Sequence, residues 1–240
     1  MRIFQKGFNF SQDGPGNRLV YHLQGCNLRC PWCSNPEGLS GSGGTEITPE
    51  ELVEEVLRSS LLFFDGGGVT FTGGEATLQF VELKAVLERL HQEGIHTCIE
   101  TNGLSLRLPE LFPVLDLLIM DLKHPDPRRH RVMTGLDNRQ TMENIRGALA
   151  FGLPLAIRIP LIGGFNASAS DAEAFAALFR ELGVPGRATV ELLPYHEYGK
   201  DKYETLGLPY TMGPEAKITG QQREAYEQIL RDAGIRLIRT

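Results

Sequence analysis

The sequence LVYHLQGCNLRCPWC, at residues 19–33, joins an apolar run to a loop that carries three cysteines. The run Leu19–Gln24 predicts a buried strand. Cys26, Cys30 and Cys33 follow it with C-x3-C-x2-C spacing. Three thiolates on one loop can ligate three irons of a [4Fe–4S] cluster, whereas clusters used for electron transfer normally take four cysteines. The loop therefore predicts a cluster whose fourth iron is left for a small molecule.

A structural zinc site is the alternative interpretation of this loop. Structural zinc takes four ligands, often as two C-x2-C pairs, and only one such pair is present. His22 would complete a set of three cysteines and one histidine, and Cys98 a set of four cysteines. Cys98 lies within a predicted strand, where we expect it to pack as a small apolar residue. Four cysteines of which three crowd one loop indicate metal binding rather than disulfides, and hence a reducing compartment.

Composition limits the classes of protein to which the chain can belong. Its 240 residues are 41% hydrophobic and 22% charged, which is enough to bury a substantial core in one domain, residues 1–240. The net charge of −6, without a dense Lys/Arg tract, argues against nucleic acid as a partner. No apolar signal region and no apolar run of roughly 20 residues is present, so we expect no membrane partner and a cytoplasmic location. An open cluster would be oxygen-sensitive, which indicates an anaerobic or microaerobic setting.

Strand-like and helix-like segments alternate along the whole chain. Thr48, followed by Pro49 and by Glu51 three positions on, is typical of a helix start. The predicted strands are Leu19–Gln24, Val69–Thr72, His96–Glu100, Leu117–Asp121, Leu155–Leu161, Thr189–Leu193 and Ile235–Ile238. Repeated β–α units predict an α/β fold with a parallel sheet covered by helices, whose functional residues lie at the carboxyl ends of the strands. Periodicity alone does not separate a partial barrel from a doubly wound sheet. The glycine- and serine-rich residues 38–44 predict a mobile loop.

The sequence GGGVTFTGGE, at residues 66–75, contains the second candidate site. Gly73 and Gly74 permit positive φ and close approach of a ligand to the backbone. Exposed carbonyl groups together with the Glu75 carboxylate suit an ammonium group, which only donates hydrogen bonds. A tight βα turn, with glycines needed for packing, is the alternative interpretation of this segment taken alone.

Several further motifs occur in a fixed order from Asp13 to about Lys200. They are DGPGNR at 13–18, the cysteine loop, GGVT at 67–70, TGGEA at 72–76, GIHTC at 94–98, TNG at 101–103, DLK at 121–123 and LLPYHE at 192–197. This ordered set resembles the glycyl-radical-enzyme activating enzymes of the radical S-adenosylmethionine (SAM) superfamily, whose type member activates pyruvate formate-lyase. The resemblance implies a partial (β/α)6 TIM-like barrel with a radical SAM core. It also implies that no general acid or base is required, because the cofactors supply the chemistry.

The resemblance also assigns roles to individual residues. Cys26, Cys30 and Cys33 would ligate the cluster. SAM would be held by residues from several loops: Trp32, Cys33, Ser34, Gly73, Gly74, Glu75, Asp121, Leu122, Lys123, Arg158 and His196. Arg158 is interpreted either as a partner of the SAM carboxylate or as a member of an ion pair inside the barrel. Asp13 and Gly14 would hold the partner's target peptide, unless their segment is simply a turn.

The chain departs from the family type near Glu100. The type enzyme has Asp-Thr where this chain has Glu100-Thr101, so a monovalent cation at Glu100, Thr101 and Asp121 is a weaker expectation here. Many relatives also carry a ferredoxin-like insert with further cysteines after the cluster loop. This chain has no such cysteines, and we expect a single cluster.

The interpretation implied by the resemblance is an oxidoreductase of the formate C-acetyltransferase-activating type. A [4Fe–4S] cluster and SAM would generate a 5′-deoxyadenosyl radical that removes hydrogen from a backbone glycine of a partner glycyl radical enzyme. A flavodoxin or ferredoxin would supply the electron. Two alternatives are a radical SAM enzyme that acts on a small molecule or another peptide, and a non-catalytic module that binds an iron–sulfur cluster or zinc.

Overall fold

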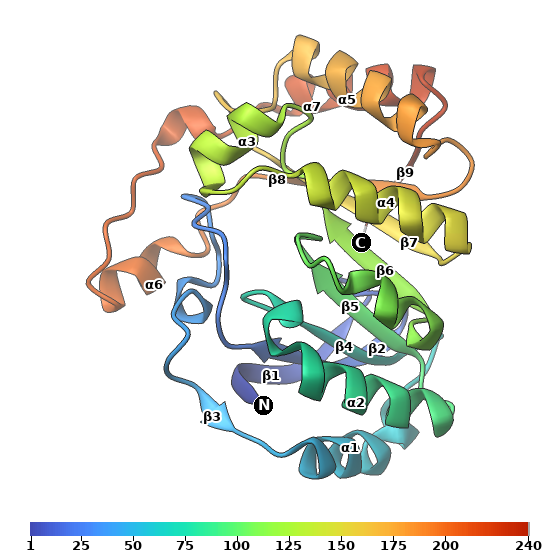
Figure 1. Ribbon diagram of the computed structural model, residues 1–240. Coiled ribbons are helices and arrows are strands. Elements are labelled where there is room, and N and C mark those ends of the chain that lie inside the picture. Colours follow the sequence, from blue (N-terminus) through green and yellow to red (C-terminus); the bar gives the residue numbers. More distant parts are fainter. Residues whose placement is uncertain (240) are drawn as a thin grey trace.

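The computed structural model describes residues 1–239 and contains one nine-stranded sheet with the order β3-β1-β2-β4-β5-β6-β7-β8-β9 (Figure 1). Its strands are β1 (Arg2–Phe10), β2 (Asn17–Leu23), β3 (Thr45–Glu46), β4 (Gly68–Gly73), β5 (Thr97–Thr101), β6 (Leu117–Asp121), β7 (Leu155–Leu161), β8 (Thr189–Pro194) and β9 (Arg236–Ile238). Its α-helices are α1 (Pro49–Arg58), α2 (Phe80–Gln92), α3 (Pro127–Thr134), α4 (Arg139–Phe151), α5 (Ala169–Leu182), α6 (Lys200–Thr205) and α7 (Gly220–Asp232).

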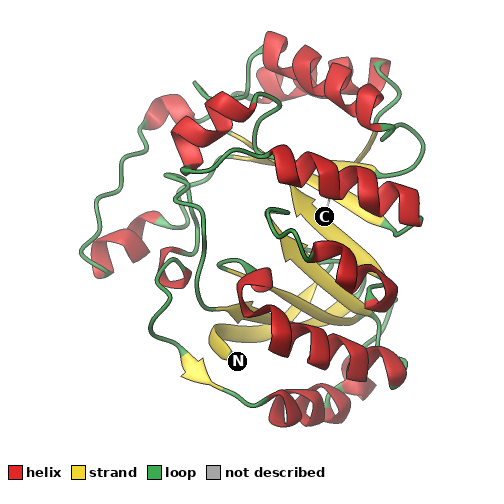
Figure 2. Ribbon diagram, viewed as in Figure 1, coloured by secondary structure: helices red, strands yellow, loops and turns green. Residues whose placement is uncertain are grey.

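The strands from β2 to β9, apart from the short β3, form a continuous parallel ladder. β1 pairs antiparallel with β2, and β3 with β1. In the described part of the chain, β3 and β9 are the two edges of the sheet, so the curved sheet does not close. Helices lie along its outer side (Figure 2). The expected partial barrel is confirmed, with β2, β4, β5, β6, β7 and β8 as the predicted parallel units.

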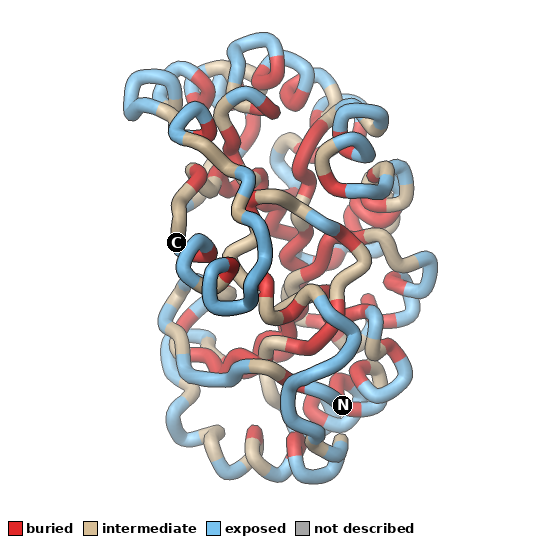
Figure 3. The backbone as a smooth tube through the Cα atoms, turned by 90° about the vertical axis from the view of Figure 1, so that its left-hand side faces the viewer, coloured by how far each residue is buried: buried red, intermediate tan, exposed pale blue. Residues whose placement is uncertain are grey.

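The core lies between the strands and these helices, where buried backbone gathers (Figure 3). β6, with the sequence LLIMD, is buried in its middle three residues, as expected for a parallel strand covered on both faces. α1 begins with the predicted capping box, in which Thr48 accepts from the Glu51 amide and Glu51 accepts from the Thr48 amide. Among residues 1–239, no helix combines the length and the apolar character needed to span a membrane.

Several elements differ from the expectation. The β1–β2 hairpin, the short β3 and helices α3 and α6 were not predicted. The residues of β1 do not alternate clearly between buried and exposed, and α3 is largely polar. The glycine-rich residues 38–44 were expected to form a mobile loop. Instead, the buried Gln24 amide donates to the carbonyl oxygens of Glu37 and Ser40 at 2.8 Å and of Ser42 at 3.2 Å. These bonds anchor the loop to the end of β2.

Candidate functional site

The cysteine loop and the Gly-Gly-Glu turn are joined by their backbones at the carboxyl ends of β2 and β4. Leu23 and Gly73 are register partners, and the amide of Gly74 donates to the Leu23 carbonyl at 2.9 Å. The Glu75 amide donates to the Gly25 carbonyl at 2.7 Å. A Cβ at Gly74 would lie 2.1 Å from that carbonyl oxygen, so only glycine permits this approach. The two motifs therefore form one structural unit.

The three cysteines are half-buried and reduced. Backbone amides of Leu28 and Asn35 lie 3.4 Å from the Sγ atoms of Cys26 and Cys33, which favours sulfur in its anionic form. Burial nevertheless raises the pKa of Cys26 to about 11 and that of Cys30 to about 12. The thiols therefore stay protonated until a metal displaces the protons.

Asp121 and Lys123 bring a buried charge pair from the end of β6. Lys123 is 7% exposed and its Nζ is ion-paired with the Asp121 carboxylate. Burial alone would lower the pKa of Lys123, but the charge of the neighbouring Asp121 carboxylate raises it. The lysine is thus a permanent cation beside the cysteine loop, and the intervening Leu122 is buried in the core.

Glu75 links the glycine turn to the segment that follows β5. Its carboxylate is 1% exposed and accepts four hydrogen bonds, from the amide and hydroxyl of Thr77, the hydroxyl of Thr101 and the amide of Asn102. The Asn102 side-chain amide then donates to the side-chain oxygen of Asn27, in the cysteine loop, at 2.7 Å. Three of these bonds go to Oε1 and one to Oε2, so the carboxylate that was expected to receive an ammonium group is already engaged by the protein. In the sequence, Asn102 was marked only as part of the TNG motif, and its contact with the cysteine loop was not predicted.

The residues expected around a monovalent cation make separate contacts. The carboxylate of Glu100 accepts from the Thr72 hydroxyl at 3.1 Å and from Arg158 at 2.8 Å. Thr101 donates to Glu75, and Asp121 pairs with Lys123. Each of these three side chains therefore has a protein partner in the structure, and the cation site stays a prediction.

Arg158 occupies the barrel interior. Its Nε donates to Glu191 at 2.9 Å, its guanidinium also pairs with Glu100, and it donates to the Gln12 carbonyl. Of the two interpretations of Arg158, the structure forms the internal ion pair. The Gln12 contact also draws the 11–16 turn against β7. In that turn, Gly14 has φ +121° and the carbonyl of Asp13 accepts from the Thr70 hydroxyl at 2.7 Å. Burial, followed by repulsion from Glu100, raises the pKa of Asp13.

The segment after β8 lies against the last cysteine. A Cβ at Gly199 would lie 2.3 Å from the Cys33 carbonyl oxygen and 3.1 Å from the Cα of Ser34. The side chain of Lys202 contacts Asn35 at 3.0 Å and Glu37 at 2.6 Å. Sequence reasoning missed this clamp, because a glycine and a lysine in a polar stretch carry no distinctive signal.

Trp32 and His196 each lie against aromatic partners. Trp32 is buried with its ring 5.0 Å from that of Phe165. The His196 ring stacks on Tyr198 at 3.9 Å, and burial lowers the pKa of His196. Tyr198 thus covers one face of the His196 ring, and the expected role beside a nucleoside stays a prediction.

Within residues 1–239, no three His, Cys, Asp or Glu side chains are close enough to share a single metal ion, and this holds for Cys26, Cys30 and Cys33 as well as for the zinc sets with His22 or Cys98. Cys98 is fully buried against Ile119 and Ala156, as expected for a small apolar residue. The His22 ring lies 5.5 Å from the Phe4 ring.

Comparisons with known proteins agree with this geometry. The Radical SAM superfamily model matches residues 20–186. The pyruvate formate-lyase-activating enzyme of Clostridium pasteurianum is 35% identical over 223 residues, 92% of each chain. The crystal structure of a domain of the pyruvate formate-lyase-activating enzyme from Bacteroides vulgatus is 30% identical, with a TM-score of 0.58, over 72% of this chain and 98% of that one. A radical SAM methyltransferase from Sphaerobacter thermophilus, at 22% identity, shares the fold with a TM-score of 0.69 over 96% of this chain and 67% of that one. The chain therefore belongs to the radical SAM superfamily and, within it, to the family of pyruvate formate-lyase-activating enzymes.

Proposed function

We propose that this chain activates a glycyl radical enzyme of the pyruvate formate-lyase type, with a [4Fe–4S] cluster on Cys26, Cys30 and Cys33 and SAM beside it. One observation carries the proposal. Motifs far apart in the sequence follow the carboxyl ends of β2, β4 and β6 in one sheet, and hydrogen bonds from Gly74, Glu75 and Asn102 tie the glycine turn and the TNG segment to the cysteine loop.

The residues present fit both groups. Three cysteine sulfurs on one loop, two of them receiving amide hydrogens, match the soft ligands that iron–sulfur clusters require. The Gly73–Gly74 turn has no room for a side chain, because the backbone of residues 22–25 packs against it. Lys123 offers a permanent positive charge to a carboxylate.

When bound and reduced, the cluster and SAM together supply a 5′-deoxyadenosyl radical, which takes a hydrogen atom from a glycine Cα of the partner protein. The chain's own residues bind and orient. The Glu75 network fixes the glycine turn to the cysteine loop, and Lys202 and Gly199 hold the loop from the other side. His196 offers a flat surface for the nucleoside.

The partner's glycine loop would enter through the open side of the barrel, near Asp13 and Gly14. In the free protein the Asp13 carboxylate accepts from the Asn9 side chain at 2.5 Å, so a peptide amide would compete for that carboxylate. A flavodoxin or ferredoxin supplies the electron in this proposal. A monovalent cation at Glu100, Thr101 and Asp121 is not part of this proposal.

Anaerobic reconstitution tests the cluster assignment. The chain and its Cys30→Ser and Cys98→Ser variants are loaded with iron and sulfide, reduced with dithionite and given SAM. We expect four irons per chain and 5′-deoxyadenosine from the wild type and from Cys98→Ser, but neither from Cys30→Ser. Equal loss in both variants, or bound zinc after strictly anaerobic preparation, would contradict the proposal. 5′-Deoxyadenosine without a radical on any glycyl radical enzyme would favour a small-molecule or other peptide substrate.

A further inference from the structure

Helix α3 and the cysteine loop together present a group of arginines on the surface. We define the α3 basic patch as Arg29, Arg128, Arg131 and Arg139, all of which are exposed. Two carboxylates contact the patch. Asp137 lies 2.6 Å from Arg131 and 3.0 Å from Arg139, and Asp126 accepts from the backbone amide of Arg128 at 2.7 Å. Four guanidinium groups beside these two carboxylates still make this a positive region on a chain whose net charge is −6.

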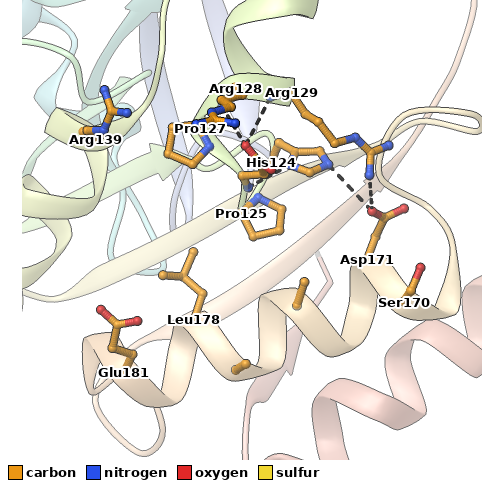
Figure 4. Close-up of a pocket in the computed structure, with 13 residues that line it drawn as sticks. His124, Pro125, Pro127, Arg128, Arg129, Arg139, Ser170, Asp171, Leu178 and Glu181 are labelled. Atoms are coloured by element: carbon orange, nitrogen blue, oxygen red, sulfur yellow. Dashed lines mark hydrogen bonds and ion pairs between the residues drawn. The ribbon is translucent and has the colours of Figure 1, made fainter.

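The patch also carries an exposed apolar residue. Arg128, Arg131 and Val132 lie three and four positions apart, on one face of α3. Val132 is 83% exposed. Arg129 is not counted in the patch, because it turns away to pair with Asp171 on α5 at 2.9 Å (Figure 4). A groove of about 780 Å³ borders the patch between α3 and α5, and Arg128 and Arg139 line it. Apolar contact ringed by charge is typical of a docking surface.

The patch lies directly beside a cluster ligand. The amide of Arg29 donates to the carbonyl of Thr134, the last residue of α3, at 2.8 Å. Arg29 is bonded to Cys30, and Met133 and Cys30 pack on the same apolar group around Trp32. One hydrogen bond and one residue therefore separate α3 from a cysteine that would hold the cluster.

We propose that the α3 basic patch docks an acidic protein that carries a low-potential one-electron group and reduces the cluster. The proposal rests on the proposed function. One electron leaves the carrier, which is oxidised by one electron, and enters the cluster, which is reduced from the 2+ to the 1+ state; no proton or other group moves. Complementary charge suits this step, because electron-transfer partners form small interfaces and depend on steered association.

The test uses the cluster-loaded protein and an acidic flavodoxin under anaerobic conditions. The variant Arg128→Glu/Arg131→Glu reverses two exposed charges of the patch. The matched control is Arg58→Glu/Arg89→Glu, which makes the same change in net charge on α1 and α2, at arginines that are 69% and 60% exposed. The affinity for oxidised flavodoxin is measured by titration calorimetry, and cluster reduction by reduced flavodoxin is followed by stopped flow at several salt concentrations.

For the patch variant we expect at least about a tenfold loss in the association rate at low salt, weaker binding, and a flattened salt dependence. The control should stay within about twofold of the wild type. SAM cleavage driven by dithionite should be unchanged in both variants, since dithionite needs no docking surface. If dithionite fails in the wild type as well, the proposed function is at fault rather than the docking site.

Two results would overturn the docking proposal. In the first, the patch variant binds flavodoxin and is reduced by it as well as the wild type is, or the control variant loses as much affinity and association rate as the patch variant. In the second, the patch variant keeps flavodoxin binding but loses affinity for the glycyl radical enzyme, which would assign the patch to the other partner.

Discussion

Replacement of Arg158 by methionine should destabilise the protein more than any exposed charge change. The guanidinium is 5% exposed and bridges the carboxylates of Glu100 and Glu191. Methionine leaves two carboxylates near each other without their counter-ion, and removal of one partner from a buried ion pair costs about 3–5 kcal/mol. For a chain of this size, 1 kcal/mol corresponds to roughly 2–4 °C, so the melting temperature should fall by roughly 6–20 °C.

The assay is thermal unfolding followed by circular dichroism at pH 8 and at pH 5. Arg58→Met is the control, because its pair with Glu54 is exposed and should contribute less than about 1 kcal/mol. The loss in Arg158→Met should shrink at the lower pH. Burial alone would raise the pKa of Glu100, but Arg158 lowers it, so without Arg158 the glutamate becomes protonated more readily and the repulsion is relieved.

A fall in melting temperature no larger than that of the control would refute this reasoning. A loss of stability that grows as the pH falls would refute it as well, because protonation of Glu100 removes one of the two charges that repel each other. Addition of Glu191→Gln to Arg158→Met should recover part of the loss, and failure to do so would show that repulsion is not its cause.

Three further predictions concern the cysteine loop, the glycine turn and α3. Gly199→Ala places a Cβ 2.3 Å from the Cys33 carbonyl oxygen and should lower the iron content per chain after reconstitution, whereas Gly220→Ala, which has open space, should not. Glu75→Gln should lower the free energy of unfolding by about 1–3 kcal/mol, because the new amide nitrogen would face a hydrogen-bond donor, either the Thr101 hydroxyl or the Asn102 amide. An unchanged melting temperature would contradict the network. Burial lowers the pKa of His130 from 6.5 to about 4, so its stabilising contribution is complete above pH 6.5. About 3 kcal/mol should be lost as the pH falls to 4, and His130→Gln should remove that slope from urea titrations.

The strands that carry the site were predictable because parallel strands are buried on both faces. The predicted segments 117–121 and 155–161 match β6 and β7, and the others agree with the observed strands within two residues. Apolar runs bounded by turn residues leave few alternatives for such segments. The β1–β2 hairpin escaped prediction because most of β1 is exposed, and its exposed positions mix Lys6 with Phe8 and Phe10.

The candidate site was predicted as a set of residues, but not as a set of contacts. The spacing of the cysteines and the order of the motifs indicated which residues meet at the strand ends. Which carboxylate binds which partner depends on side-chain reach. Glu100 contacts Arg158, and Glu75 contacts the Asn102 amide. Each of these pairs joins residues that are far apart in the sequence, so local sequence patterns do not indicate them. The position of Gly199 against Cys33 depends on a segment of irregular backbone, for which periodicity gives no signal.

The central claim is that three cysteines and SAM in this chain generate a radical on a glycine of another protein. The most direct measurement is electron paramagnetic resonance of the anaerobically reconstituted chain, reduced and mixed with SAM and a pyruvate formate-lyase. The account predicts the doublet of a glycyl radical on the partner, with an equal amount of 5′-deoxyadenosine, and neither product with Cys30→Ser. A fully loaded [4Fe–4S] preparation that cleaves no SAM would contradict it.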